Sequence, residues 1–261
     1  MNNVYIMSAN RSAIGGFGGT LKNHCPVDLG TLVAKEAIVR SGFEANEVEH
    51  AVFGNVIHTE PRDMYVSRVI ALQAGMDKAS AALTVNRLCG SGLQAIVSAS
   101  QILMLGDASV AMAGGVEVMS NGAHIVQGFR WGSRMGDGQV HDMMLGALHD
   151  PFGHGHMGIT AENISSRYQI SREMQDEFAL TSQKRAHEAI ENGYFKDQIL
   201  PIEIKTRKGI KIFEIDEHPK PETSMETLKG LRTAFKKDGV VTAGNASGIN
   251  DGASALVLAN E

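Results

Sequence analysis

The sequence predicts an α/β fold built in layers, and three observations support that class. Apolar runs of strand length alternate with amphipathic runs of helical length through about the first 118 residues. A stretch rich in glycine, histidine, methionine and arginine follows with weak periodicity. Residues 250–259 then combine an Asn-Asp-Gly turn with an apolar strand. We therefore expect a doubly wound α/β arrangement, an elaborated loop region and a last strand.

The predicted elements of the first part follow one another in regular order. Strand patterns cover residues 4–7, 52–57, 82–85 and 108–113. Amphipathic helical patterns cover residues 29–41, 65–74 and 93–105. A glycine-rich turn at 14–19 follows the first strand, but its glycines do not lead directly into a helix, as a dinucleotide-binding turn requires. We expect a flexible loop there.

The second part is irregular at first and helical later. Residues from Ser120 to about Gly158 lack clear periodicity, and long irregular segments in a compact protein are more often functional or interfacial than accidental. Helical patterns return at 161–168 and at 174–191, the second with Ser171 as its N-cap.

Composition restricts the class of protein. The chain has 261 residues, 43% of them hydrophobic and 20% charged, which suits one substantial core or two smaller lobes. A net charge of -5 gives no general reason to bind nucleic acid or an anionic membrane. Two cysteines cannot build a disulfide framework, and we recognise no secretory signal and no stretch approaching a membrane span. We expect a cytoplasmic protein.

Cys89 falls between the predicted strand 82–85 and the predicted helix 93–105. Unpaired N–H groups and the dipole at the start of a helix stabilise a thiolate over a thiol. Gly90 and Gly92 leave room for an acyl group to approach the sulfur. This pattern favours a nucleophile for acyl transfer. A small buried cysteine that fills space beside a glycine-rich turn is the alternative, and position alone does not decide between them.

Four separated motifs resemble those of the thiolase family, in its acetyl-CoA acetyltransferase branch. They are Asn-Arg-Leu-Cys-Gly-Ser-Gly at 86–92, Gly-Gly-Val-Glu-Val-Met-Ser at 114–120, His-Met-Gly-Ile-Thr-Ala-Glu-Asn at 156–163 and Gly-Asn-Ala-Ser-Gly-Ile-Asn-Asp-Gly-Ala at 244–253. Their order matches the family over nearly the whole chain. The resemblance implies an acyltransferase of fatty acid metabolism, with acetoacetyl-CoA formation or cleavage as its parent reaction.

The resemblance also implies a fold and a division into domains. The fold would be the thiolase-like layered fold, with a mixed five-stranded sheet and helices on both faces. Residues 1–119 and 245–261 would form the N-terminal thiolase half. Residues 120–244 would form an inserted α+β loop domain, a lid over the coenzyme A tunnel. The C-terminal half of the family would be absent.

By resemblance, Cys89 is the catalytic residue. It would attack an acyl-CoA thioester, release coenzyme A, and hold the acyl group as a thioester until a second acyl-CoA or free coenzyme A takes it. Coenzyme A thioester is then the substrate, and no separate cofactor is expected.

The resemblance assigns seven further residues to coenzyme A. His156 and Met157 would line the pantetheine tunnel, which favours short acyl chains. Phe235 would pack against the pantetheine, and Ala243 and Ser247 would contact its amides. Near the phosphates, Lys220 stands where the family often has arginine and Thr227 where it often has serine.

Other polar clusters have simpler explanations. A metal site is not expected, because the spacing of the loop residues His141, Asp142, His149, Asp150, His154 and His156 matches no helix-presented ligand pair. Cys25 precedes a proline in a loop and matches no catalytic motif. Glu117 follows two glycines at a strand end, where a local cap or pair is an alternative to a base.

Three motifs that the family also needs do not occur in this sequence: Gly-His-Pro, Cys-x-Gly and Asn-Glu-Ala-Phe. Three interpretations stay open, namely a fragment of a thiolase, one subunit of a split thiolase, and a non-catalytic coenzyme A-binding or assembly module. Each predicts exposed apolar helix surface, including part of the helix after Cys89, and hence a homo-oligomer or a separate C-terminal half as partner. A ketoacyl synthase shares the nucleophilic cysteine but lacks the long lid and the 244–252 loop.

Overall fold

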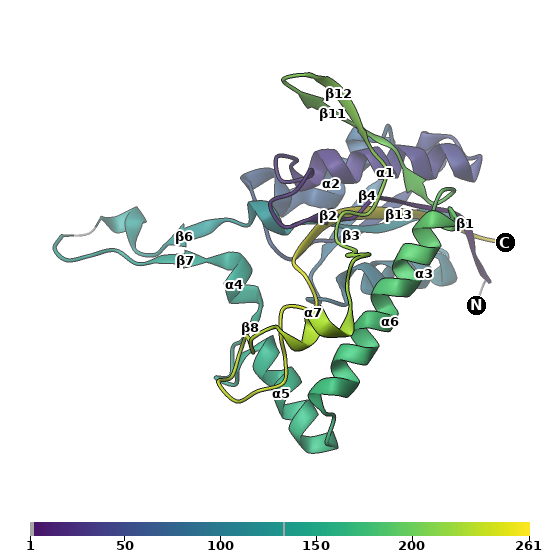
Figure 1. Ribbon diagram of the computed structural model, residues 1–261. Helices are drawn as coiled ribbons and strands as arrows, with labels where there is room; N and C mark the ends of the chain where they lie inside the picture. Colours follow the sequence, from purple (N-terminus) through teal and green to yellow (C-terminus); the bar gives the residue numbers. More distant parts are fainter. Residues whose placement is uncertain (1–2, 133) are drawn as a thin grey trace. The chain divides into compact units, whose positions relative to one another are not determined.

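The computed structural model describes residues 3–132 and 134–261 (Figure 1). The chain forms two compact units. Unit 1 comprises Met1–Ile125, Asp197–Glu217 and Asn250–Glu261, and unit 2 comprises Val126–Lys196 and His218–Ile249. By packing, therefore, residues 197–217 belong with the sheet rather than with the rest of the predicted 120–244 insertion. The function of that insertion as a lid stays a prediction.

Unit 1 is built on a mixed sheet in which the strands run in the order β10-β1-β13-β5-β3-β4, with β2 paired to β13. The five long strands are β1 (Val4–Ser12), β13 (Asn250–Asn260), β5 (Val110–Val118), β3 (His50–Gly54) and β4 (Ala81–Val85). β3 lies parallel to β4 and β5, whereas β13 lies antiparallel to β1 and β5. Two short strands, β2 (Gly15–Gly16) and β10 (Ile199–Leu200), extend the predicted five to seven.

Helices cover both faces of this sheet. In Figure 1, α1 (Pro26–Ser41) and α2 (Val66–Gln73) lie on one face and α3 (Ser91–Leu105) lies on the other. The start of α1 precedes the predicted one because Pro26 occupies the first turn, where its missing N–H costs nothing. Gly42, at φ 79°, ends the helix in the left-handed conformation that glycine adopts readily.

The core of unit 1 lies between the sheet and its helices. Small residues on α3, Ala95 and Ala99, are fully buried and let the helix approach the sheet closely, and Leu103 fills the space beyond them. Gly54 at the end of β3 makes a close approach to α3, because a Cβ there would lie 2.7 Å from the backbone carbonyl carbon of Ser91. The first turn of α3 is thereby seated directly against β3.

The segment Leu88–Leu105, which contains α3, is long and apolar enough to cross a membrane by length and composition. This differs from the expectation that no stretch approaches a membrane span. Its apolar residues divide between a face packed on the sheet and an exposed face with Leu93, Val97 and Leu105. One such helix is weak support for a membrane location, since a core helix meets the same criterion.

Short elements complete the chain. In unit 1, η1 (Ala45–Glu47), η2 (Pro61–Tyr65) and η3 (Met119–Asn121) are 3₁₀ turns, and β11 (Ile202–Thr206) pairs with β12 (Gly209–Phe213) as a hairpin. β6 (His124–Val126) pairs with β7 (Val140–Asp142), and η4 (Phe129–Trp131) lies between them in sequence.

Unit 2 begins irregularly and becomes helical, as predicted. α4 (Met143–Ala147), β8 (His149–Asp150) and β9 (Gly155–His156) precede α5 (Met157–Tyr168), α6 (Arg172–Glu191) and α7 (Met225–Lys229). The side chain of Ser171 accepts a hydrogen bond from the N–H of Met174, which confirms Ser171 as the N-cap of α6.

Candidate active site

Cys89 is exposed and lies in the turn between β4 and α3, one residue before Gly90, the N-cap of the helix. The N–H of Gly90 donates to the carbonyl of Arg87 at 3.1 Å, and the N–H of Ser91 donates to the carbonyl of Leu88 at 2.9 Å. These two bonds close the turn around the cysteine. The predicted position at a strand-to-helix turn is confirmed, and the alternative of a buried, space-filling cysteine is wrong.

The chemistry of such a position follows from its backbone. The N–H groups in the first turn of a helix have no partner within the helix, and the helix dipole adds positive potential there. Both effects stabilise negative charge that develops on the oxygen of a carbonyl group bound there. The exposed thiol is open to a carbonyl carbon.

Cys25, the other cysteine, has a different environment. It is half-buried, and Nη2 of Arg62 donates to its sulfur at 3.1 Å. Burial and the neighbouring Asp28 carboxylate raise the pKa of the Cys25 thiol to about 12. Cys25 therefore stays protonated at neutral pH and is a poor nucleophile.

Glu117 anchors a loop beside the cysteine helix. Its carboxylate accepts hydrogen bonds from the N–H of Ile57 at 2.8 Å, from the N–H of Val56 at 3.0 Å and from Nδ2 of Asn55 at 3.0 Å. Burial raises the pKa of Glu117 to about 7, although the two N–H donors act in the opposite direction. These contacts match the local pairing considered from the sequence.

In unit 2, His156 and Phe235 lie together. His156 is the N-cap of α5, and its Nδ1 accepts from the N–H of Gly158 at 3.0 Å. The His156 ring stacks on Phe235, with centroids 4.8 Å apart, and meets His149 edge-on at 5.1 Å. Burial, and then His149, lower the pKa of His156, which favours the neutral imidazole. Met157 follows directly and is exposed.

Ala243 and Ser247 lie on one exposed loop of unit 2, between Val241 and β13. The hydroxyl of Ser247 donates to the carbonyl of Gly248 at 3.2 Å.

Buried polar side chains hold this loop in place. The Glu162 carboxylate accepts from the N–H groups of Val240 at 3.0 Å and Val241 at 2.9 Å. Asn245 donates to Asp176 at 2.9 Å and accepts from the N–H of Thr242 at 2.7 Å. Asp176 is fully buried, and Nε of Arg172 donates to it at 2.8 Å.

Lys220 and Thr227 are both exposed but differ in what they offer a ligand. The backbone N–H of Lys220 donates to Oε1 of Gln183 at 2.8 Å, and the Lys220 side chain extends from that position. The hydroxyl of Thr227 takes part in the capping box of α7, where it donates to the carbonyl of Ser224 at 2.9 Å. A phosphate at Thr227 would have to compete with that bond.

Several of the loop histidines and aspartates, Asp142, His149 and Asp150 among them, make local hydrogen bonds. Asp142 caps α4 by accepting from Met144 N–H at 2.9 Å, and Asp150 accepts from Phe152 N–H at 3.0 Å. Among residues 3–132 and 134–261, no group of three or more His, Cys, Asp or Glu side chains could hold a metal ion.

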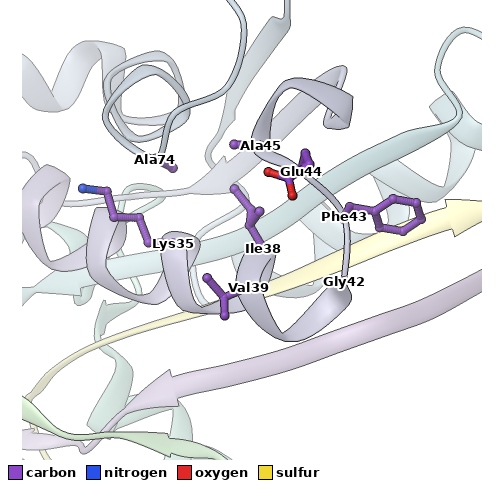
Figure 2. A pocket seen from close by; sticks show the side chains of 8 residues that line it. All are labelled: Lys35, Ile38, Val39, Gly42, Phe43, Glu44, Ala45 and Ala74. Atoms are coloured by element: carbon purple, nitrogen blue, oxygen red, sulfur yellow. The ribbon is translucent and has the colours of Figure 1, made fainter.

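A cavity of about 480 Å³ lies elsewhere in unit 1 (Figure 2). Figure 2 shows side chains of α1, of the segment 42–45 and of Ala74 around it. It contains neither Cys89 nor any residue predicted to contact coenzyme A.

Several residues that shape these sites carry no signal in the sequence patterns. Glu162 and Asn245 stand within the recognised motifs, but their partners lie 78 and 69 residues away in the chain. Asp176 sits in an amphipathic helix, where nothing in the pattern distinguishes it from a solvated carboxylate. Ser91 follows the cysteine by two residues, and only the turn geometry shows what its hydroxyl does.

Residues 4–261 match the family model described as thiolase, N-terminal domain. The chain belongs to the thiolase family. The family predicted from the four motifs is thus confirmed, and known thiolases show the same fold. The crystal structure of the Bacillus anthracis acetyl-CoA acetyltransferase superposes with a TM-score of 0.96 at 47% identity, over 100% of this chain and 66% of that one.

Other thiolases are similar over the same extent. The beta-ketothiolase BktB of Cupriavidus necator is 55% identical over 256 residues, which cover 98% of this chain and 65% of that protein. Human mitochondrial 3-ketoacyl-CoA thiolase, in a structure with bound CoA, gives a TM-score of 0.94 at 38% identity, over 100% of this chain and 65% of that one. The chain thus spans slightly less than two-thirds of the length of these thiolases.

Proposed function

We propose that this thiolase chain takes an acyl group from acyl-CoA and holds it as a thioester on Cys89. One observation carries the proposal: Cys89 is exposed in the turn that begins α3. The names of the relatives, acetyl-CoA acetyltransferase and beta-ketothiolase, supply the class of substrate. The bound CoA in the human thiolase structure supports coenzyme A as the leaving group.

The proposed step exchanges one thioester for another. The Cys89 thiolate adds to the carbonyl carbon of acyl-CoA, the carbonyl oxygen becomes an oxyanion, and the bond to the coenzyme A sulfur then breaks. The departing thiolate takes up a proton, so the thiol proton of Cys89 is replaced by the acyl group. Backbone N–H groups stabilise the oxyanion more strongly than the starting carbonyl, which lowers the barrier.

We extend the proposal to coenzyme A contacts in unit 2. His156, Met157 and Phe235 would form the apolar wall for the pantetheine arm, and Ala243 and Ser247 would meet its amides. The His156–Phe235 stack and the braced 240–245 loop support this assignment.

Lys220 and Thr227 would face the phosphates, and the parts of residues 120–244 that belong to unit 2 would act as the lid. Lys220 is the stronger candidate of the two, since its ammonium is exposed whereas the Thr227 hydroxyl is used by the capping box. The proposed compartment is the cytoplasm, and no cofactor beyond the substrate is invoked.

Acetyl transfer is tested by incubating the protein with acetyl-CoA and measuring the intact mass, followed by peptide mapping. We expect one acetyl group, located on the peptide containing Cys89. Cys89→Ser should abolish the adduct, and the matched control Cys25→Ser should retain it. An adduct that persists in Cys89→Ser contradicts the assignment. Binding of coenzyme A without any adduct in the natural protein favours a binding module instead.

A further inference from the structure

Leu88, the residue before the cysteine, has an unfavourable backbone conformation. Its φ is 48°, and among the described residues only one other non-glycine residue, Gln169, has a positive φ. In this region the Cβ of an L-residue crowds the backbone, and leucine has no polar group to compensate. The side chain is 56% exposed, so packing of that side chain does not explain the conformation.

The hydroxyl of Ser91 spans the turn on both sides of Leu88. It accepts a hydrogen bond from the N–H of Arg87 at 2.8 Å and donates one to the carbonyl of Leu88 at 2.6 Å. The same carbonyl accepts the N–H of Ser91 at 2.9 Å. Ser91 is buried, where exchange of these bonds for water is disfavoured.

Ser91 is in turn fixed by β3. A Cβ at Gly54 would lie 2.7 Å from the carbonyl carbon of Ser91 and 2.8 Å from its Cβ. The absence of a side chain at Gly54 therefore lets the first turn of α3 rest directly on the end of the strand.

We propose that Ser91 is a positioning residue for Cys89. Its hydroxyl holds Leu88 in the left-handed conformation and thereby places the Cys89 sulfur at the start of α3. The one hydroxyl proton goes to the Leu88 carbonyl, so Ser91 acts through the turn and not on the substrate. The relevance of Ser91 to acyl transfer rests on the proposed function of Cys89. Its effect on the geometry of the turn does not depend on that function.

The first test measures the rate at which iodoacetamide alkylates Cys89, in a Cys25→Ser background. Ser91→Ala should slow alkylation about tenfold, the fold-change expected from losing a buried hydrogen bond. Gly54→Ala should have a similar effect, because it displaces Ser91 while keeping the hydroxyl. The matched control is Ser98→Ala on the same helix, where the hydroxyl accepts from Nε2 of Gln94 at 3.1 Å. The control should stay within about twofold of the parent.

A rescue separates positioning from a general effect on folding. Leu88→Gly adopts a positive φ without help, so Leu88→Gly with Ser91→Ala should react within about threefold of Leu88→Gly alone. This comparison also holds if Ser91→Ala by itself does not fold. The proposal is overturned if removing the hydroxyl costs the same factor with glycine at position 88 as with leucine. It is also overturned if Ser91→Ala folds and reacts like the parent.

Alkylation needs no coenzyme A, which distinguishes the two proposals. Fast alkylation of the parent protein without an acetyl adduct would contradict the proposed function. The alkylation rates of the Ser91 variants would then decide the positioning role by themselves. An acetyl adduct that forms in the parent and declines with Ser91→Ala in parallel with alkylation supports both. A decline in acetylation at an unchanged alkylation rate would overturn the positioning role.

Discussion

The two cysteines show how strongly the local environment decides the chemistry of one residue type. Cys25, the N-cap of α1, is half-buried beside a carboxylate, and both features oppose its ionisation, whereas Cys89 is exposed in the turn before α3. The same thiol is therefore inert at one position and available for attack at the other.

This difference predicts selective alkylation. At pH 8 we expect iodoacetamide to modify Cys89 at least about tenfold faster than Cys25, because the Cys25 pKa of about 12 leaves little thiolate. Peptide mass mapping over a time course measures both rates in one sample. Equal rates, or faster loss of Cys25, would be incompatible with this environment.

Glu117 predicts a pH dependence of stability. Its folded pKa of about 7 lies above the ordinary 4.5, so the folded state favours the protonated form. Its contribution is full below pH 4.5 and is lost as pH rises through 7, with a magnitude on the order of 3 kcal/mol.

The measurement for Glu117 is the free energy of unfolding between pH 4.5 and 8, from denaturant titrations. Glu117→Gln should remove this decline relative to the natural protein, whatever it does to absolute stability. Glu214→Gln, at an exposed glutamate of the same unit, should leave the pH profile unchanged. A Glu117→Gln profile parallel to that of the natural protein would exclude this carboxyl as the cause.

At the scale of elements, close approaches at glycines join the layers of unit 1. Gly54 receives the first turn of α3 on the sheet, whereas Gly114 on β5 receives the ring of Phe53 from the neighbouring strand β3 within the sheet. Neither Gly54 nor Gly114 has a positive φ angle. Glycine is therefore needed at these positions because a side chain would not fit, and not because of the backbone conformation.

Gly114→Ala should therefore destabilise the protein. The new Cβ would lie 2.4 Å from the Phe53 ring and 2.5 Å from the carbonyl oxygen of Ser254, and overpacking of this kind costs about 1–3 kcal/mol. Gly16→Ala on β2 is the control, because nothing lies within 4 Å of its added Cβ. Denaturant unfolding of both variants tests the difference. Equal stabilities would show that the sheet accommodates the methyl group by shifting.

The periodicity of apolar residues was sufficient to predict most long elements. It placed β1, β3, β4, α1, α2 and α3 in the right order, because each buries one face against the same core. Element ends were less accurate, since they depend on single capping residues such as Pro26 and His156.

Apolar periodicity could not predict some short strands and some contacts between residues distant in the sequence. β2 and β10 have only two residues each, too few for any period to show. The return of residues 197–217 to unit 1 depends on contacts such as the 2.8 Å ion pair of Arg11 with Asp216, 205 residues apart. For the candidate site, the motifs identified Cys89 and its turn. The roles of Ser91, Glu162 and Asp176 required the three-dimensional hydrogen bonds.

At the scale of the whole molecule, the apolar residues left in solvent are as informative as the core. Leu93, Val97 and Leu105 on α3 are exposed although they stand on the helix that follows Cys89. Exposed apolar surface of this kind favours association with a second copy or with a separate thiolase half.

We expect light scattering after size exclusion to give a mass above the 28.0 kDa of one chain. Replacing both Leu93 and Val97 by serine should shift the distribution toward monomer, because the association would lose apolar contact area. Val39→Ser, at an exposed apolar residue of α1, is the control. A monodisperse monomer that captures no partner would contradict the expectation.

Acyl-enzyme formation is measured most directly in a single turnover with limiting acetyl-CoA, by following free coenzyme A and the mass of the Cys89 peptide in the same quenched samples. We expect coenzyme A to appear and the acetylated peptide to accumulate at equal rates and in equal amounts, and both signals to vanish in Cys89→Ser. Release of coenzyme A with no acetyl group on that peptide, or no release at all, would contradict the assignment of Cys89 as the acyl-carrying nucleophile.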